Sequence, residues 1–161
     1  MERNILAVGD VVAPAGVKYC KAALPRLRRE LSVDFCVVNG ENAAVLGMLP
    51  APAEELLSAG ADVITMGNHN CGRRALVPYL ERSRAVLRPA NLPQQQPGRG
   101  WGVFETPFGD VAVLDLIGRC GMAYTPDNPL QPVERTPRTI QTKPIPLELN
   151  PEATLHEMAP G

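Results

Sequence analysis

The sequence has few aromatic side chains, almost no net charge and no long apolar run. Phe, Trp and Tyr make up 4% of 161 residues, so aliphatic and alanine side chains must fill the interior. Sixteen basic and 17 acidic side chains give a net charge of -1, which offers no strong field for a nucleic acid or an anionic membrane surface. No run reaches transmembrane length, and Asp10 interrupts the apolar start too early for a signal peptide. We therefore expect a cytoplasmic protein with no membrane partner and no strong nucleic-acid signal.

Two kinds of motif are also missing. The four cysteines form no CxxC pair, which favours reduced thiols over disulfide bridges. Neither GxGxxG nor GxxxxGK[ST] follows the first apolar run, so a Rossmann-like nucleotide-binding module lacks support. A thiol enzyme that uses Cys71 beside His69 is a further alternative, although residues two apart at a strand end need not face each other.

Proline, in contrast, is abundant and unevenly distributed. Eight of the 17 prolines fall in the last 36 residues, where each one removes a backbone donor. A chain of 161 residues can still bury one ordinary core. We therefore divide the sequence into a core at 1–117 and a proline-rich, largely irregular tail at 118–161, in which no helix or strand is expected.

Short apolar runs alternate with amphipathic segments up to about residue 91. This pattern predicts strands at 4–8, 35–38, 63–66 and 85–87, and helices at 16–31, 53–59 and 73–83, the first kinked or divided at Pro25. Alternation over short connections predicts parallel neighbours in an α/β layer. Strands at 102–106 and 111–117 should form an antiparallel hairpin around Gly109-Asp110.

Each of the first three predicted strands ends in a glycine beside polar residues. The three segments are Gly9-Asp10, Asn39-Gly40-Glu41-Asn42 and Gly67-Asn68-His69-Asn70. Parallel strands place their carboxyl ends on one edge of the sheet, where ligands bind in open α/β folds. Carboxylates, amides and one imidazole suit hard or borderline divalent ions, which predicts a two-metal site.

Structural explanations compete with this interpretation for each residue taken singly. Asp10 could cap the following helix, and Asn42 or Asn70 could stabilise turns. A lone histidine such as His69 is more often structural. Glu41 is harder to explain in this way, because glutamate is a poor turn former. The joint arrangement, and no single residue, therefore supports the metal site.

The order GD, GEN and GNH, each after an apolar run, resembles the calcineurin-like metallophosphoesterases. The segments VGDVVAPAG, FCVVNGENAA, AGADVITMGNH and LRPANLP are similar to the YmdB-type bacterial phosphodiesterases, which act on 2',3'-cyclic nucleotides. The resemblance runs from about residue 5 to residue 117 and resumes weakly at 127–129 and 152–154. It implies an α/β fold with a parallel first sheet, flanking helices and an incomplete second sheet.

The same resemblance implies a role for each residue of the site. Asp10 would ligate the first of two metal ions, Glu41 would bridge the two, and Asn68 would ligate the second. Asn42 would lie beside the first ion, and His69 would protonate the leaving oxygen. The two divalent ions (Mn, Fe or Mg) would hold a hydroxide that attacks the phosphorus of a small phosphodiester or nucleotide substrate.

The sequence also departs from the family pattern. Val45 and Leu46 replace an expected histidine and glycine, Asn150 stands where the family has a histidine, and no Gly-x-His-x-His segment follows. We therefore expect a C-terminally truncated chain with a weakened second metal site and little or no phosphodiesterase activity of its own. The alternative is a catalytically inactive remnant that serves as a binding or assembly module.

The incomplete second sheet has a consequence for packing. The inner face of the first sheet would be left partly bare unless the proline-rich tail or another chain covers it. A homo-oligomer that covers the open sheet face is therefore a possible assembly.

Overall fold

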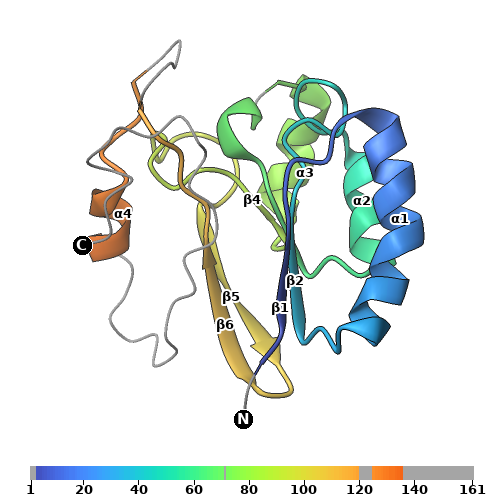
Figure 1. Cartoon of the computed structure of the whole chain (residues 1–161). Helices are drawn as coiled ribbons and strands as arrows, with labels where there is room; N and C mark the ends of the chain where they lie inside the picture. The colour runs from blue at the N-terminus through green and yellow to red at the C-terminus, as the bar shows by residue number, and fades with distance from the viewer. Residues whose placement is uncertain (1–2, 71, 120–124, 136–161) are drawn as a thin grey trace.

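The computed structural model describes residues 3–70, 72–119 and 125–135, so most of the predicted tail lies outside the described residues. Four strands form one parallel sheet in the order β1-β2-β3-β4 (Figure 1). Their bounds are β1 Ile5–Val8, β2 Phe35–Asn39, β3 Val63–Thr65 and β4 Val86–Leu87. The parallel α/β layer predicted from the alternating pattern is therefore confirmed.

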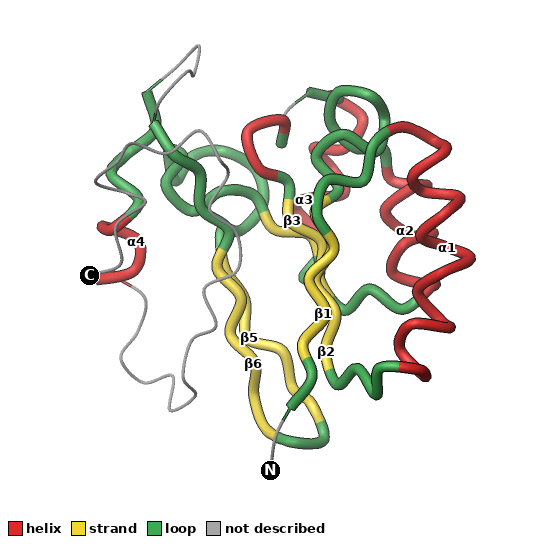
Figure 2. The backbone as a smooth tube through the Cα atoms, in the orientation of Figure 1, coloured by secondary structure: helices red, strands yellow, loops and turns green. Residues whose placement is uncertain are grey.

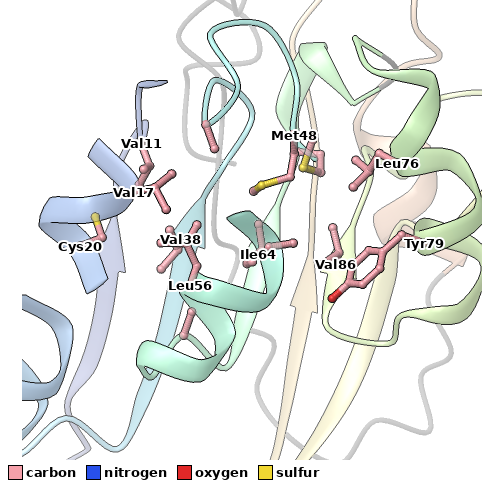
Figure 3. Close-up of a cluster of buried hydrophobic side chains, with 14 of the residues drawn as sticks. Val11, Val17, Cys20, Val38, Met48, Leu56, Ile64, Leu76, Tyr79 and Val86 are labelled. Atoms are coloured by element: carbon pink, nitrogen blue, oxygen red, sulfur yellow. The ribbon is translucent and has the colours of Figure 1, made fainter. Parts of the chain in front are cut away.

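Three helices cover one face of this sheet (Figure 2). They are α1 Ala13–Glu30, α2 Pro50–Ala59 and α3 Val77–Arg82. Successive strand residues point to opposite faces, and Val38 and Ile64 point toward the helices. There they pack with Val17 of α1 and Leu56 of α2 in a continuous apolar cluster (Figure 3). None of the helices among the described residues is both long and apolar enough to cross a membrane.

The opposite face of the sheet is covered by an antiparallel hairpin, β5 Trp101–Thr106 and β6 Gly109–Leu114. Val111 and Val113 of β6 pack against side chains of the parallel sheet that are at most 3% exposed: Phe35, Val37, Val63 and Leu87. The expectation of a partly bare inner face is therefore wrong for the described strands, because one hairpin is enough to bury these side chains.

Several boundaries differ from the predicted ones. Pro25 does not divide α1, which runs unbroken to Glu30. The hairpin turn consists of Pro107 and Phe108, and Gly109, with φ +117, is already the first residue of β6. The predicted third helix is a 3-10 turn at Arg74–Leu76 followed by α3.

A short helix, α4 Leu130–Arg135, lies where no helix was expected. Asn128 begins it: the Asn128 side-chain oxygen accepts a hydrogen bond from the Leu130 amide at 3.0 Å. Pro132 falls in the first turn, where a missing backbone donor costs nothing. The prolines that argued against a helix are thus compatible with its start. The domain division at residue 117 stays a prediction.

Candidate functional site

Backbone hydrogen bonds bring the loops after β1, β2 and β3 to one edge of the sheet. The Val11 amide donates to the carbonyl of Asn39 at 3.0 Å, which joins the first loop to the second. The Gly40 amide donates to the carbonyl of Thr65 at 3.0 Å, which joins the second to the third strand. The predicted convergence of the three polar segments is therefore present.

Asn42 connects Asp10 with His69. Its amide nitrogen donates to both carboxylate oxygens of Asp10, at 3.0 and 2.9 Å. Its amide oxygen lies 2.9 Å from Nδ1 of His69. Asp10 therefore does not cap the following helix, whose first residue, Ala13, is preceded by a cap position without a side-chain hydrogen bond. Three of the five predicted site residues form one continuous chain of hydrogen bonds.

Glu41 joins this network from the buried side. Glu41 is 7% exposed, and its Oε1 accepts a hydrogen bond from Asn39 Nδ2 at 3.2 Å. Its Oε2 accepts one from the His69 backbone amide at 3.3 Å and lies 3.8 Å from His69 Nδ1. Among the described residues, no lysine or arginine lies within 4.0 Å of this carboxylate. A buried carboxylate held by neutral donors beside an imidazole is typical of a functional site.

Sequence reasoning gave no role to Asn39 or Gly67, and both position Glu41. The Asn39 side-chain oxygen accepts a hydrogen bond from the Glu41 backbone amide at 3.0 Å. Asparagine side chains often stabilise a turn by such a bond to the backbone two residues further on. Gly67 has φ +43, and a Cβ there would lie 2.6 Å from Cδ of Glu41. The Glu41 carboxylate thus occupies space that only a glycine leaves open. The asparagine two residues before Glu41 was a signal that the sequence did contain.

The remaining predicted residues lie at the same edge or outside the described part of the chain. Asn68 is half-buried and shares the 3-10 turn Gly67–His69 with His69, while its metal role stays a prediction. Asn70 is 4% exposed and donates to Gln96 Oε1 at 3.3 Å, which links the edge to the loop after β4. Cys71, the residue of the thiol-enzyme alternative, and Asn150, which replaces a family histidine, lie outside the described residues.

The oxygen donors of Asp10, Glu41 and Asn42 have the chemistry for a hard divalent ion that keeps several water ligands. They do not by themselves fit two ions. In the described part of the chain, no three His, Cys, Asp or Glu side chains form a group that could hold a metal. The carboxylate oxygens of Asp10 and Glu41 also accept hydrogen bonds from Asn42, Asn39 and His69, which an ion would have to displace.

Comparison with known proteins relates this arrangement to a family. A model of the YmdB-like protein family matches residues 6–160. A 2',3'-cyclic-nucleotide 2'-phosphodiesterase of Bacillus subtilis (strain 168) is 32% identical over 160 residues. That match covers 98% of this chain and 61% of the Bacillus enzyme, so the chain spans less than two thirds of its relative's length.

Two crystal structures have the same fold. A protein from Thermus thermophilus aligns with a TM-score of 0.73 and 32% identity, over 81% of this chain and 51% of the other. A phosphatase from Mycoplasma pneumoniae aligns with a TM-score of 0.74 and 27% identity, over 83% of this chain and 50% of the other. The predicted α/β fold, with a parallel first sheet, flanking helices and a small second sheet among the described residues, is confirmed by the strand pairing and by these structures.

Proposed function

Because the chain belongs to the YmdB-like protein family, we propose that it supplies part of a metal-dependent phosphodiesterase site that hydrolyses small phosphodiesters such as 2',3'-cyclic nucleotides. The observation that carries this proposal is the network Asp10–Asn42–His69–Glu41, which gathers two carboxylates, an amide and an imidazole at the ligand-binding edge of a parallel sheet.

His69 is the proposed catalytic acid. Its Nδ1 faces the amide oxygen of Asn42, so Nε2 is the nitrogen left to carry a proton to the substrate. In the reaction, an oxygen of water bonds to phosphorus and releases one proton to the solvent, the ester P–O bond breaks, and the leaving oxygen takes the proton from Nε2, which His69 regains from the solvent. Glu41 stabilises the imidazolium that precedes this transfer, because its Oε2 lies 3.8 Å from Nδ1.

Asp10, Glu41, Asn42 and Asn68 are the proposed metal ligands. A bound divalent ion would polarise a phosphoryl oxygen and make water more acidic. We assign one ion to the donors at the edge that carries Asp10 and Glu41. A second ion should bind weakly, because these residues leave it too few donors.

A binding or assembly module without turnover is the second candidate function. The absence of a group of three His, Cys, Asp or Glu metal donors among the described residues favours it. This module would keep the same edge as a binding surface. The two candidates differ in turnover, which only the phosphodiesterase requires.

The test is a calorimetric titration of the purified chain with manganese, combined with an assay on 2',3'-cyclic AMP. Asp10→Ala and His69→Ala are the site variants, and Asp110→Ala, at an exposed position of the hairpin, is the matched control. The phosphodiesterase proposal expects turnover that both site variants abolish and Asp110→Ala retains. Manganese binding lost only in Asp10→Ala, without turnover in any protein, favours the binding module. Equal turnover in all variants would overturn the roles proposed for Asp10 and His69.

A further inference from the structure

The loop after β2 forms a tight turn at 44–47, directly after the site residues Glu41 and Asn42. Two backbone amides of this 44–47 turn bond back to them: Val45 donates to the carbonyl of Asn42 at 2.8 Å, and Gly47 donates to the carbonyl of Glu41 at 2.7 Å. The Ala44 amide donates to the carbonyl of Gly47 at 2.9 Å and closes the turn. The position of the turn therefore determines where the backbone of Glu41 and Asn42 lies.

The backbone of the 44–47 turn is strained. Val45 has φ +71, a rare conformation for a β-branched residue, and it is 66% exposed, so little burial offsets the cost. Ala13, with φ +61, donates to the same Asn42 carbonyl at 2.9 Å. Among the described residues, two of the three non-glycine residues with positive φ thus bond to one carbonyl of the candidate site. A strained turn keeps its shape only where neighbouring groups hold it.

Arg73, on the segment after His69, is such a group. Its Nε donates to the carbonyl of Leu46 at 3.1 Å, and its Nη2 donates to the carbonyl of Ala44 at 2.8 Å. These two carbonyls lie on either side of Val45 in the sequence. Because the planar guanidinium donates in fixed directions, two bonds at once fix both the position and the orientation of the strained turn.

The turn and the Arg73 segment approach each other closely at two glycines. A Cβ on Gly72 would lie 3.1 Å from the backbone nitrogen of Gly47, and a Cβ on Gly47 would lie 3.1 Å from Cα of Gly72. The Gly72 amide also donates to the carbonyl of His69 at 3.0 Å. Arg73 therefore lies where the loop after β2 meets the loop after β3, and these two loops carry opposite ends of the hydrogen-bond network.

We propose that Arg73 is a positioning residue of the candidate site. It holds the 44–47 turn against the segment after His69 and thereby fixes the side chains of Glu41 and Asn42 relative to the imidazole. Its two hydrogen bonds go to the backbone of the turn, so it acts through that backbone and does not touch the reacting groups. The effect of Arg73 on turnover rests on the proposed function, whereas its effect on the side-chain geometry does not.

Nitrogen-15 NMR of the His69 imidazole measures this geometry in the full chain with a metal chelator present. The Asn42 oxygen lies 2.9 Å from Nδ1 and favours the Nδ1-protonated form of the neutral ring. Without the guanidinium, Val45 can relax and release the Asn42 carbonyl, so Arg73→Ala should shift the ring toward the Nε2-protonated form. Arg74→Ala is the matched control, because Arg74 is the next residue and is also exposed. It should leave the imidazole signals unchanged.

Two further variants separate the contact with two carbonyls from the positive charge. Arg73→Lys keeps the charge but loses the fork, so it should show most of the shift seen in Arg73→Ala. Gly72→Ala keeps Arg73 but pushes the turn away from it, so it should shift the signals in the same direction. Unchanged signals in Arg73→Ala, signals of Arg73→Lys equal to those of the parent protein, or an equal shift in Arg74→Ala would each overturn the proposal.

Turnover of 2',3'-cyclic AMP gives the second measurement. Arg73→Ala should lower kcat about tenfold or more with little change in KM, because the misplaced groups act on the reacting atoms. A fall in kcat without a shift of the imidazole signals would overturn the positioning role. A parent protein without turnover would count against the proposed function alone, because the NMR comparison needs no activity.

Discussion

Asn42 Oδ1 lies 2.9 Å from His69 Nδ1, while the amide nitrogen of the same side chain donates to both carboxylate oxygens of Asp10. The carboxylate can only accept, so the nitrogen of Asn42 must face Asp10 and its oxygen must face His69. Nδ1 of His69 therefore carries the proton in this contact. The charge of Asp10 thus sets the tautomer of His69 through one intervening amide.

Asn42→Ala should remove the preference of His69 for the Nδ1-protonated tautomer. In the parent protein, neutral His69 should be the Nδ1-protonated form, whereas the variant should show more of the Nε2-protonated form that predominates in free histidine. Nitrogen-15 NMR of the imidazole rings measures this directly. The chain contains only two histidines, and a His156→Gln variant assigns the signals.

If the proposed function holds, Asn42→Ala should also lower kcat/KM about 10- to 100-fold, the usual effect of removing a partner that orients a catalytic or metal-binding group. Unchanged imidazole signals in Asn42→Ala would contradict the role assigned to Asn42, whether or not the chain turns over substrate.

Gly67→Ala should displace Glu41. The new methyl group would overlap the carboxylate, and φ +43 is unfavourable for alanine, so we expect a loss of about 1–3 kcal/mol in the free energy of unfolding. Urea unfolding measures this change. In the background Glu41→Ala the overlap is absent, and only the smaller backbone cost should remain.

Substitutions at two other glycines separate the overlap with Glu41 from the backbone cost in the stability lost by Gly67→Ala. A Cβ at Gly9 meets nothing within 4 Å and Gly9 has no positive φ, so Gly9→Ala should be neutral. Gly109 is equally open but has φ +117, so Gly109→Ala reports the backbone cost alone. Equal losses for Gly67→Ala and Gly109→Ala would show that Glu41 does not occupy the space beside Gly67.

The sheet and the edge of the site follow from local patterns in the sequence. The apolar runs of β1, β2 and β3 are short, and each is followed by a glycine and polar residues, so strand type and ligand-binding edge could both be predicted. The side-chain contacts within this edge could not be predicted from local patterns. The bonds of Asn42 to Asp10 and His69 join residues 32 and 27 positions apart, and only the assembled sheet sets their distance.

Two predictions that treated a glycine or a proline as a local breaker of secondary structure were wrong. Gly109-Asp110 is typical of a turn, but the turn is at Pro107-Phe108 and Gly109 takes its positive φ as the first strand residue. Pro132 argued against a helix, yet the first turn of α4 accepts it because Asn128 caps that turn. Both errors come from treating a residue as a breaker when its position within the element decides its effect.

Val113→Ala should weaken the packing of the hairpin on the parallel sheet. Val113 is 1% exposed and packs beside Val37 and Val63, so loss of two methyl groups should cost about 2 kcal/mol of the free energy of unfolding. Val103→Ala on the same hairpin is the control, because Val103 is 42% exposed and should cost less than about 0.5 kcal/mol. Equal effects in thermal or urea unfolding would show that β6 does not cover the sheet.

Cys36 should be unreactive in the folded chain. It is 0% exposed on β2, and burial raises the pKa of its thiol from 9.0 to about 11, so at pH 8 roughly one thiol in a thousand is ionised. With Cys71→Ser and Cys120→Ser as background, Ellman's reagent should label Cys36 and the buried Cys20 only after unfolding in urea.

The raised pKa also predicts how stability changes with pH. The folded state holds the thiol proton more tightly than the unfolded state, so this contribution is complete below about pH 9 and is lost as the pH rises toward 11. Replacing Cys36 by alanine in the same background should remove that part of the alkaline decline. Urea unfolding between these two pH values compares the slopes. Identical slopes with and without Cys36, or rapid labelling of the native chain, would show that solvent reaches the thiol on β2.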